Sequence, residues 1–208
     1  ASLNFEATEQ QLATAKVTRV RSLKAFLTQD KGQQWEGTSE PLLLDLEGGL
    51  RGVFRSEDEP WASVAEVSGY RFARLMGSRL VPPTVPRVLE PVAGQPWPFE
   101  GKAGRPGSLQ LFVDGKPTGD TLPADLSAKD ASDIDVLSFV MGRYDNHGGN
   151  LLRDAAGAPV LIDFENSLEP QHWRFGEFSY ARRGGEHPAP PPLGIPGDQP
   201  FPFDRPQK

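Results

Sequence analysis

The sequence predicts an α+β fold in which short strands combine with a few helices. The order of the segments leads to this prediction: a hairpin in residues 37–55, a helix in residues 62–76, further strands, a second helix, and a second hairpin in residues 151–162. With 208 residues, the chain is long enough to bury a real core in one or two compact domains.

The N-terminal third predicts one hairpin after a weakly patterned start. Residues 1–30 are polar with modest helical character, and their apolar positions are Leu12, Val17, Val20 and Leu23. In residues 37–55, the apolar segments 42–44 and 50–54 flank a Glu-Gly-Gly turn, which is typical of two paired strands.

The middle of the chain predicts a helix followed by extended segments. In residues 62–76, Ala65, Phe72 and Leu75 are expected to share one face of the helix, and Gly77 lies near the helix end. Extended structure is expected in three further segments: 81–85, 87–89 and 108–113. Residues 93–105 are a Pro/Gly-rich connection between them.

A second helix and a second hairpin follow. Apolar residues recur at helical spacing up to Met141, with Ser127 as the N-cap and Asp130 in the first turn; these residues are Ile134, Leu137, Val140 and Met141. Strands are expected at 151–152 and 160–162, around a turn at 154–157. Eight prolines in residues 186–208 argue against helix or central strand in the tail.

Composition excludes several classes of function. The net charge of −6 argues against a broad nucleic-acid-binding surface, and no apolar run is long enough to span a bilayer. The absence of cysteine excludes disulfides and thiolate zinc sites. No signal peptide is visible, and the chain begins at Ala1 rather than Met, so we expect a processed or shortened chain that is soluble, either cytoplasmic or secreted.

Asp145, Asn150 and Asp163 form a pattern suited to metal-bound phosphate. The first Asp can orient an attacking hydroxyl or accept its proton, while the Asn and the second Asp can hold Mg²⁺ or Mn²⁺ against the phosphates of ATP. Gly148 and Gly149 allow the tight turn between them. Taken alone, residues 145–150 are equally consistent with a polar surface loop.

Six short motifs occur in an order that resembles a known group of kinases. They are residues 52–55 (GVFR), 65–70 (AEVSGY), 80–85 (LVPPTV), 107–113 (GSLQLFV), 145–150 (DNHGGN) and 161–163 (LID). Over residues 37–169 the chain resembles the atypical kinases that include type II and gamma-like phosphatidylinositol 4-kinases and secretory-pathway (Golgi) kinases. The resemblance implies a two-lobed protein-kinase-like fold with a minimal C-lobe: N-lobe 1–106, hinge and C-lobe 107–185, and tail 186–208.

The resemblance also assigns roles to individual residues. Asp145 is similar to the catalytic Asp, and Asn150 and Asp163 to the metal ligands. Glu66 is similar to the helix Glu that pairs with the phosphate-contacting base. The hinge that lines the adenine pocket corresponds to Gln110, Leu111, Phe112 and Val113, and a phosphate-covering loop weakly to Thr38 and Ser39, which fit an ordinary turn about as well.

Two positions depart from the family pattern. Arg55 stands where these kinases carry Lys; it keeps the charge, but its fork differs in shape, and Arg51 is the alternative base. Glu165 follows Asp163-Phe164 where a Gly is common in kinases.

The resemblance implies an ATP-dependent kinase that transfers the γ-phosphoryl group to a hydroxyl acceptor, expected to be on a protein. Three alternatives remain open: a phosphoinositide kinase, a pseudokinase or nucleotide-binding module favoured by Arg55, and an AMP-transferring enzyme on the same fold. A lipid kinase should carry a basic or apolar docking surface, and this acidic chain has no polybasic segment. The sequence leaves the oligomeric state open.

Overall fold

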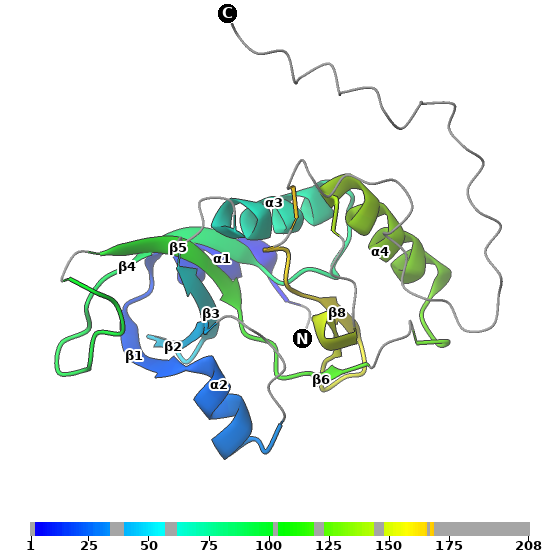
Figure 1. Cartoon of the computed structure of the whole chain (residues 1–208). Helices are drawn as coiled ribbons and strands as arrows, with labels where there is room; N and C mark the ends of the chain where they lie inside the picture. The colour runs from blue at the N-terminus through cyan, green and yellow to red at the C-terminus, as the bar shows by residue number, and fades with distance from the viewer. Residues whose placement is uncertain are drawn as a thin grey trace, which may run out of the picture.

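The computed structural model describes residues 3–33, 40–56, 62–101, 104–118, 123–143, 148–165 and 167–168. These residues form an α+β fold with two antiparallel sheets, which confirms the predicted class. The larger sheet has the strand order β1-β2-β3-β5-β4, and the smaller one β6-β7-β8. Figure 1 shows helix α3 running above the larger sheet toward α4, and the smaller sheet lying below these two helices.

The N-terminal region contains a helix and a strand. Helix α1 (Phe5–Thr14) is capped by Asn4, whose side chain accepts a hydrogen bond from the Ala7 backbone N–H, and it buries Leu12. Strand β1 (Val17–Ser22) follows and pairs with β2. The expectation of modest helical character through residue 30 was therefore wrong for β1. A short helix α2 (Leu23–Ala25) and a π-helix η1 (Phe26–Asp30) complete this region.

The first predicted hairpin is confirmed. Strands β2 (Leu42–Leu46) and β3 (Arg51–Ser56) pair in an antiparallel register, with Leu42 opposite Phe54. Gly48 and Gly49 have φ angles of 87° and 85°, a region that residues with a Cβ rarely adopt. The two glycines therefore allow the turn that sets this register.

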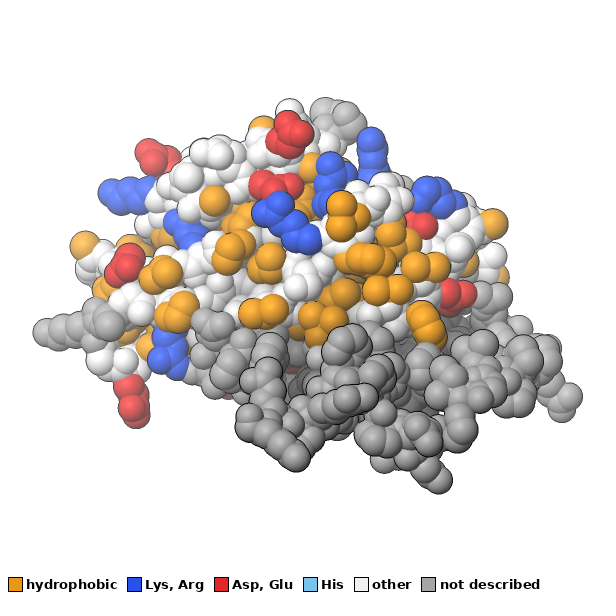
Figure 2. All heavy atoms as spheres, turned by 90° about the horizontal axis from the view of Figure 1, so that it is seen from above, with side chains coloured by type: hydrophobic (Ala, Val, Ile, Leu, Met, Phe, Trp, Pro, Cys, Tyr) orange, Lys and Arg blue, Asp and Glu red, His pale blue; other side chains and the backbone are white. Residues whose placement is uncertain are grey.

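Helix α3 (Ala62–Leu75) lies where the sequence placed it, but only part of the predicted apolar face is buried. Of the three residues expected to share a face, Ala65 is buried and Phe72 packs against the core, whereas Leu75 is 85% exposed; Glu66 is buried as well. Figure 2 shows hydrophobic side chains spread over the face seen from above, where α3 and α4 lie; exposed large hydrophobic residues of these helices are Val64, Leu75, Val136 and Phe139. Apolar spacing alone thus did not define the buried face. Gly77, with φ of 70°, follows the helix end as expected.

Strands β4 (Thr84–Leu89) and β5 (Arg105–Leu111) complete the larger sheet. The strand predicted at 108–113 is confirmed for its first part, but β5 ends before Phe112. Gly107 allows β5 to approach β3, because a Cβ at this position would lie 2.1 Å from the Arg55 carbonyl oxygen. The predicted boundary between residues 106 and 107 falls within β5, and the division into domains stays a prediction.

Helix α4 (Ala128–Met141) confirms the second helix, and the Ser127 side chain accepts a hydrogen bond from the Asp130 backbone N–H at its start. The second hairpin is confirmed as β7 (Leu151–Arg153) and β8 (Pro159–Leu161), preceded by a 3₁₀ turn η2 (Gly148–Asn150). Strand β6 (Lys116–Pro117) was not predicted. Within the described residues, no helix is long and apolar enough to cross a membrane.

Two main hydrophobic cores flank the region where the candidate site lies. One core packs the inner face of the larger sheet, including Leu44, Phe54 and Leu109. The other joins α3, α4 and the smaller sheet, and it includes Tyr70 and Phe164. Arg55 on β3 and Glu66 on α3 therefore stand on elements that two separate cores hold in place.

Candidate active site

Arg55 is surrounded by the carboxylates of three residues. We call these four residues, Arg55, Glu66, Asp163 and Glu165, the Arg55 cluster. The Nε atom of Arg55 lies 3.3 Å from Glu66 Oε1, and its Nη2 lies 3.2 Å from Asp163 Oδ2. Nη1 forms an ion pair and a hydrogen bond with Glu165 Oε2. Strand β3, helix α3 and the segment after β8 thus meet at one guanidinium group. The predicted contact between Arg55 and Glu66 is present, while their role in binding phosphate stays a prediction.

Glu66 is the deepest member of the Arg55 cluster, with 2% of its side chain exposed. Burial raises the pKa of its carboxyl to about 7, and the charges of Asp163 and Glu165 add to this increase. The Arg55 guanidinium and the Phe164 backbone N–H act in the opposite direction and lower the pKa. Glu66 therefore changes its protonation state near neutral pH.

Arg55 remains a cation in this setting. Burial lowers the pKa of its guanidinium, but attraction by Asp163, Glu66 and Glu165 outweighs burial and raises the pKa above its ordinary value. The side chain of Arg55 is 17% exposed, so part of it faces solvent. A permanent positive charge at this depth is a suitable partner for phosphate oxygens.

Asp163 is held in an unusual backbone conformation. Its φ angle is 67°, in the left-handed region that residues other than Gly rarely occupy. The next residue, Phe164, is fully buried against α3, where a Cβ on Gly69 would lie 2.6 Å from the ring. The absence of a side chain at Gly69 therefore allows Phe164 to anchor the segment and direct Asp163 toward Arg55.

Arg143, which the sequence reasoning missed, fixes the same segment from the other side. It follows α4 after Gly142 and is 1% exposed. Its Nε donates to the Asp163 carbonyl at 3.1 Å, and its Nη2 donates to the Ile162 carbonyl at 2.8 Å. The guanidinium carbon also lies 5.2 Å from the centre of the Phe164 ring. The available signal was an Arg two positions before the motif at 145–150.

Asn150 is placed beside Asp163 by the register of the smaller sheet. Leu151 pairs with Leu161, and the Ile162 backbone N–H donates to the Asn150 carbonyl at 3.0 Å. Asn150 is 5% exposed. One predicted metal ligand, Asn150, directly precedes β7, and the other, Asp163, follows its partner strand β8. Their role as ligands stays a prediction. In the described residues, no three His, Cys, Asp or Glu side chains form a metal site.

Three predicted site residues, Asp145, Thr38 and Ser39, lie outside the described residues. The convergence of Asp145 with Asn150 and Asp163 on one metal ion is therefore a prediction that the structure does not test. Residues Gly148–Asn150 follow Asp145 closely in sequence and lead directly into β7.

The predicted hinge residues, Gln110 to Val113, lie at the end of β5 and just beyond it. The Gln110 side chain donates to Thr84 Oγ1 at 3.0 Å. The Phe112 ring packs edge-on against Phe26 of η1, with 5.8 Å between ring centres. Arg51, the alternative phosphate-contacting base, lies over the Phe112 ring at 4.7 Å, so it is engaged there rather than with Glu66. Adenine binding by these residues stays a prediction.

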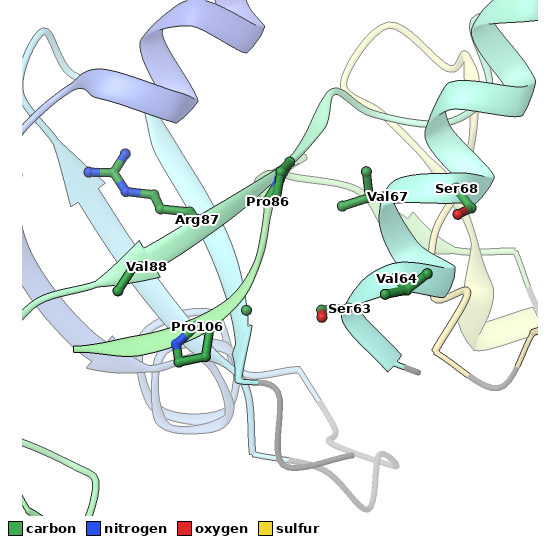
Figure 3. A pocket seen from close by; sticks show the side chains of 9 residues that line it. Ser63, Val64, Val67, Ser68, Pro86, Arg87, Val88 and Pro106 are labelled. Carbon is green, nitrogen blue, oxygen red and sulfur yellow. The ribbon is translucent and has the colours of Figure 1, made fainter. Parts of the chain in front are cut away.

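Two surface grooves lie apart from the Arg55 cluster. One, of about 400 Å³, lies between α3 and strands β4 and β5, and its lining includes Val64, Val67, Pro86 and Pro106. Figure 3 shows Val64 and Val67 on the helix and Pro86 on the strand opposite. The other, of about 450 Å³, is lined by Pro91, Trp97, Phe99 and Gly101. No member of the Arg55 cluster and no predicted hinge residue lines either groove.

Comparison with known proteins supports a kinase-like fold. No protein-family model matches the chain, and no curated protein matches it in sequence. The crystal structure of the Golgi casein kinase matches with a TM-score of 0.52 and 14% identity, over 82% of this chain and 58% of that chain. Hydra Fam20, determined with a sugar, matches with a TM-score of 0.51 and 15% identity, over 80% of this chain and 67% of that chain.

A third matched structure is the Golgi casein kinase with Mn and ADP bound, with a TM-score of 0.51 and 13% identity, over 82% of this chain and 58% of that chain. The chain thus has a fold similar to that of these atypical kinases, and at such identity the similarity shows the fold alone. It spans little more than half the length of the Golgi casein kinase.

Proposed function

We propose that this chain is an ATP-dependent phosphotransferase that moves the γ-phosphoryl group of ATP to a hydroxyl group on a protein. The main support is the meeting of Arg55, Glu66 and Asp163 from three separate elements in a kinase-like fold. Phosphoryl transfer depends on placement and charge neutralisation rather than on a strong base. A positively charged guanidinium beside carboxylates meets this need, and we propose that it does so in a two-lobed fold with a minimal C-lobe.

The side chains of Asn150 and Asp163 fit a divalent cation such as Mg²⁺ or Mn²⁺. Their oxygens are hard donors, and the three carboxylates of the Arg55 cluster exceed its single guanidinium in charge, which favours a cation nearby. A bound cation would neutralise charge on the phosphate oxygens. Arg55 would bind phosphate through its fork, and Asp145 would orient the acceptor hydroxyl and take its proton.

A protein acceptor is favoured over a lipid acceptor by charge. The chain has a net charge of −6 and no polybasic segment, so it lacks the electrostatic feature that draws proteins to anionic membranes. One of the matched proteins is named for a protein acceptor, casein. These two observations together point to a protein hydroxyl.

A nucleotide-binding module without transfer activity is the second candidate. Arg55 replaces the expected Lys, and it already contacts three carboxylates, including the predicted metal ligand Asp163. An arginine engaged in this way has to give up contacts before it binds phosphate. Binding and transfer therefore need to be measured separately.

The test is incubation of the full chain with γ-labelled or α-labelled ATP and Mg²⁺ or Mn²⁺, offering casein or phosphatidylinositol vesicles. Transfer of the γ-label to casein is the expected result. Transfer of the α-label would identify an AMP-transferring enzyme, and labelling of the vesicles a lipid kinase. Nucleotide binding without any transfer would favour the second candidate.

Two variants test the assigned roles. Asp145→Ala should retain ATP but lose transfer by about 100-fold or more, the scale of a positioned acid–base group. Asp163→Ala should lose metal-dependent ATP binding in calorimetry. Asp45→Asn, which removes a carboxylate paired with Arg21 outside the cluster, is the matched control and should behave as wild type. Transfer at the wild-type rate by Asp145→Ala would show that its assignment is wrong.

A further inference from the structure

All three nitrogens of the Arg55 guanidinium face carboxylates, and these carboxylates lie at different depths. Nε faces Glu66, whose side chain is 2% exposed. Nη2 faces Asp163 and Nη1 faces Glu165, whose side chains are 20% and 22% exposed. The two terminal nitrogens are therefore engaged by the carboxylates that lie nearer to the solvent.

A phosphate group that reaches Arg55 from solvent would need these terminal nitrogens. Arginine binds phosphate best through two parallel N–H···O bonds from two of its nitrogens. The Glu165 carboxylate forms the same type of charge-assisted hydrogen bond with Nη1 that a phosphate oxygen would form. A carboxylate of the chain itself thus occupies a donor that the phosphate would use.

Glu165 differs from the other two carboxylates because the proposed reaction gives it no task. Glu66 contacts Arg55 from the buried side, and Asp163 is a predicted metal ligand. The Glu165 side chain is 22% exposed and forms an ion pair with Nη1 of Arg55. The contact between Glu165 and Arg55 therefore needs a separate explanation.

We propose that Glu165 sets the affinity for the nucleotide by competing with its phosphates for Arg55. The inference rests on the proposed function for the identity of the competing anion. Without nucleotide, Glu165 holds Arg55; when nucleotide binds, its phosphate replaces the Glu165 carboxylate on Nη1. Neutralising Glu165 weakens the competing contact and removes one negative charge from the cluster, and both changes strengthen anion binding.

The test is calorimetric titration of the full chain with Mg-ATP and, separately, with inorganic tripolyphosphate without metal. Glu165→Gln should bind both about tenfold more tightly, the effect of losing one charge-assisted contact. Asp45→Asn is the matched control, because it removes a carboxylate that is 27% exposed and ion-paired with Arg21 at 2.9 Å. The control should bind both probes as wild type does. Unchanged or weaker binding by Glu165→Gln would overturn the inference.

A double variant tests whether the gain passes through Arg55. Glu165→Gln combined with Arg55→Met should bind tripolyphosphate no more tightly than Arg55→Met alone. A gain that persists without Arg55 would overturn the inference. In the wild-type chain, tripolyphosphate should shift the NMR signal of the Glu165 carboxylate carbon; binding without this shift would also overturn it, and this measurement needs no variant to fold.

The two probes separate this inference from the proposed function. If Glu165→Gln tightens tripolyphosphate binding but neither protein binds Mg-ATP, the proposed function fails and the competition for Arg55 stands. If wild type binds and uses Mg-ATP but Glu165→Gln changes neither titration, the competition fails and the proposed function stands.

Discussion

Two arginines that contact the segment around Asp163, the half-buried Arg55 and the buried Arg143, have different kinds of partner. Arg55 contacts three carboxylates, all on side chains, whereas Arg143 donates to the backbone carbonyls of Ile162 and Asp163. A side-chain carboxylate can rotate away and be replaced by another anion, but a backbone carbonyl cannot leave without moving the chain. The difference indicates that Arg143 has a fixed structural role, while Arg55 can exchange its partners for a ligand.

The largest expected effect comes from removing the fixed arginine. Arg143→Met leaves two carbonyls without their donors in a buried region, and this should lower the free energy of unfolding by roughly 2–5 kcal/mol. Chemical denaturation followed by circular dichroism measures the loss. Arg153→Met is the control, because Arg153 pairs with the exposed Asp125 and donates to the Gly157 carbonyl in the exposed β7–β8 turn, where water can replace it, and its loss should cost at most about 1 kcal/mol. Equal losses for the two variants would contradict the fixed structural role of Arg143.

Local chemistry explains what the sequence could predict. Ser127 caps α4 through its own side chain, and the glycines at 48 and 49 set the β2–β3 turn, so both features depend only on neighbouring residues. Strand β1 was missed because its burial does not alternate, and it exists through pairing with β2. Leu75 is exposed although Ala65 of the same predicted face is buried, because periodicity does not show where the neighbouring core ends.

The sequence could predict several residues of the candidate site, but it could not predict most of their contacts. The motifs singled out Arg55, Glu66 and Asp163, and the predicted contact of Arg55 with Glu66 is present, whereas its contact with Asp163 was not predicted. The burial of Arg143 depends on carbonyls about 20 positions away in the chain, which no local pattern reveals. Glu165 stood out only as a departure from a common Gly, and its contact with Arg55 required the folded chain.

The exchangeable arginine predicts a pH dependence that the fixed one does not. Burial raises the pKa of Glu66 from an ordinary 4.5 to about 7. Between these values the folded chain binds a proton that the unfolded chain has lost, so stability falls as pH rises through this window and changes no further from this group above about pH 7. Backbone carbonyls around Arg143 do not titrate in this range.

Glu66→Gln should therefore flatten the pH dependence of stability between pH 5 and pH 8. The loss of stability that wild type shows over this interval should shrink by roughly 2–3 kcal/mol. Urea denaturation at several pH values measures the difference. Asp45→Asn, outside the cluster, should keep the wild-type slope. A Glu66→Gln variant with the wild-type slope would show that proton binding by Glu66 does not cause the pH dependence of stability.

The smallest expected effect probes the link between the two arginines, which is the Phe164 anchor. In Gly69→Ala, the new Cβ would lie 2.6 Å from Cδ1 and Cγ of Phe164, so the Phe164 ring has to move. The backbone of residues 162–165, which contacts both Arg55 and Arg143, should move with the ring. Overpacking of this kind costs roughly 1–3 kcal/mol, and the better helix propensity of Ala returns about 1 kcal/mol, so the net loss should be at most about 2 kcal/mol. Ser68→Ala, one position away on the same helix, should not lower stability. Thermal unfolding compares the two variants, and tripolyphosphate titration reports on Arg55. If Gly69→Ala is as stable as wild type and binds the anion equally well, Phe164 does not couple the two arginines, and the position of Asp163 depends on Arg143 alone.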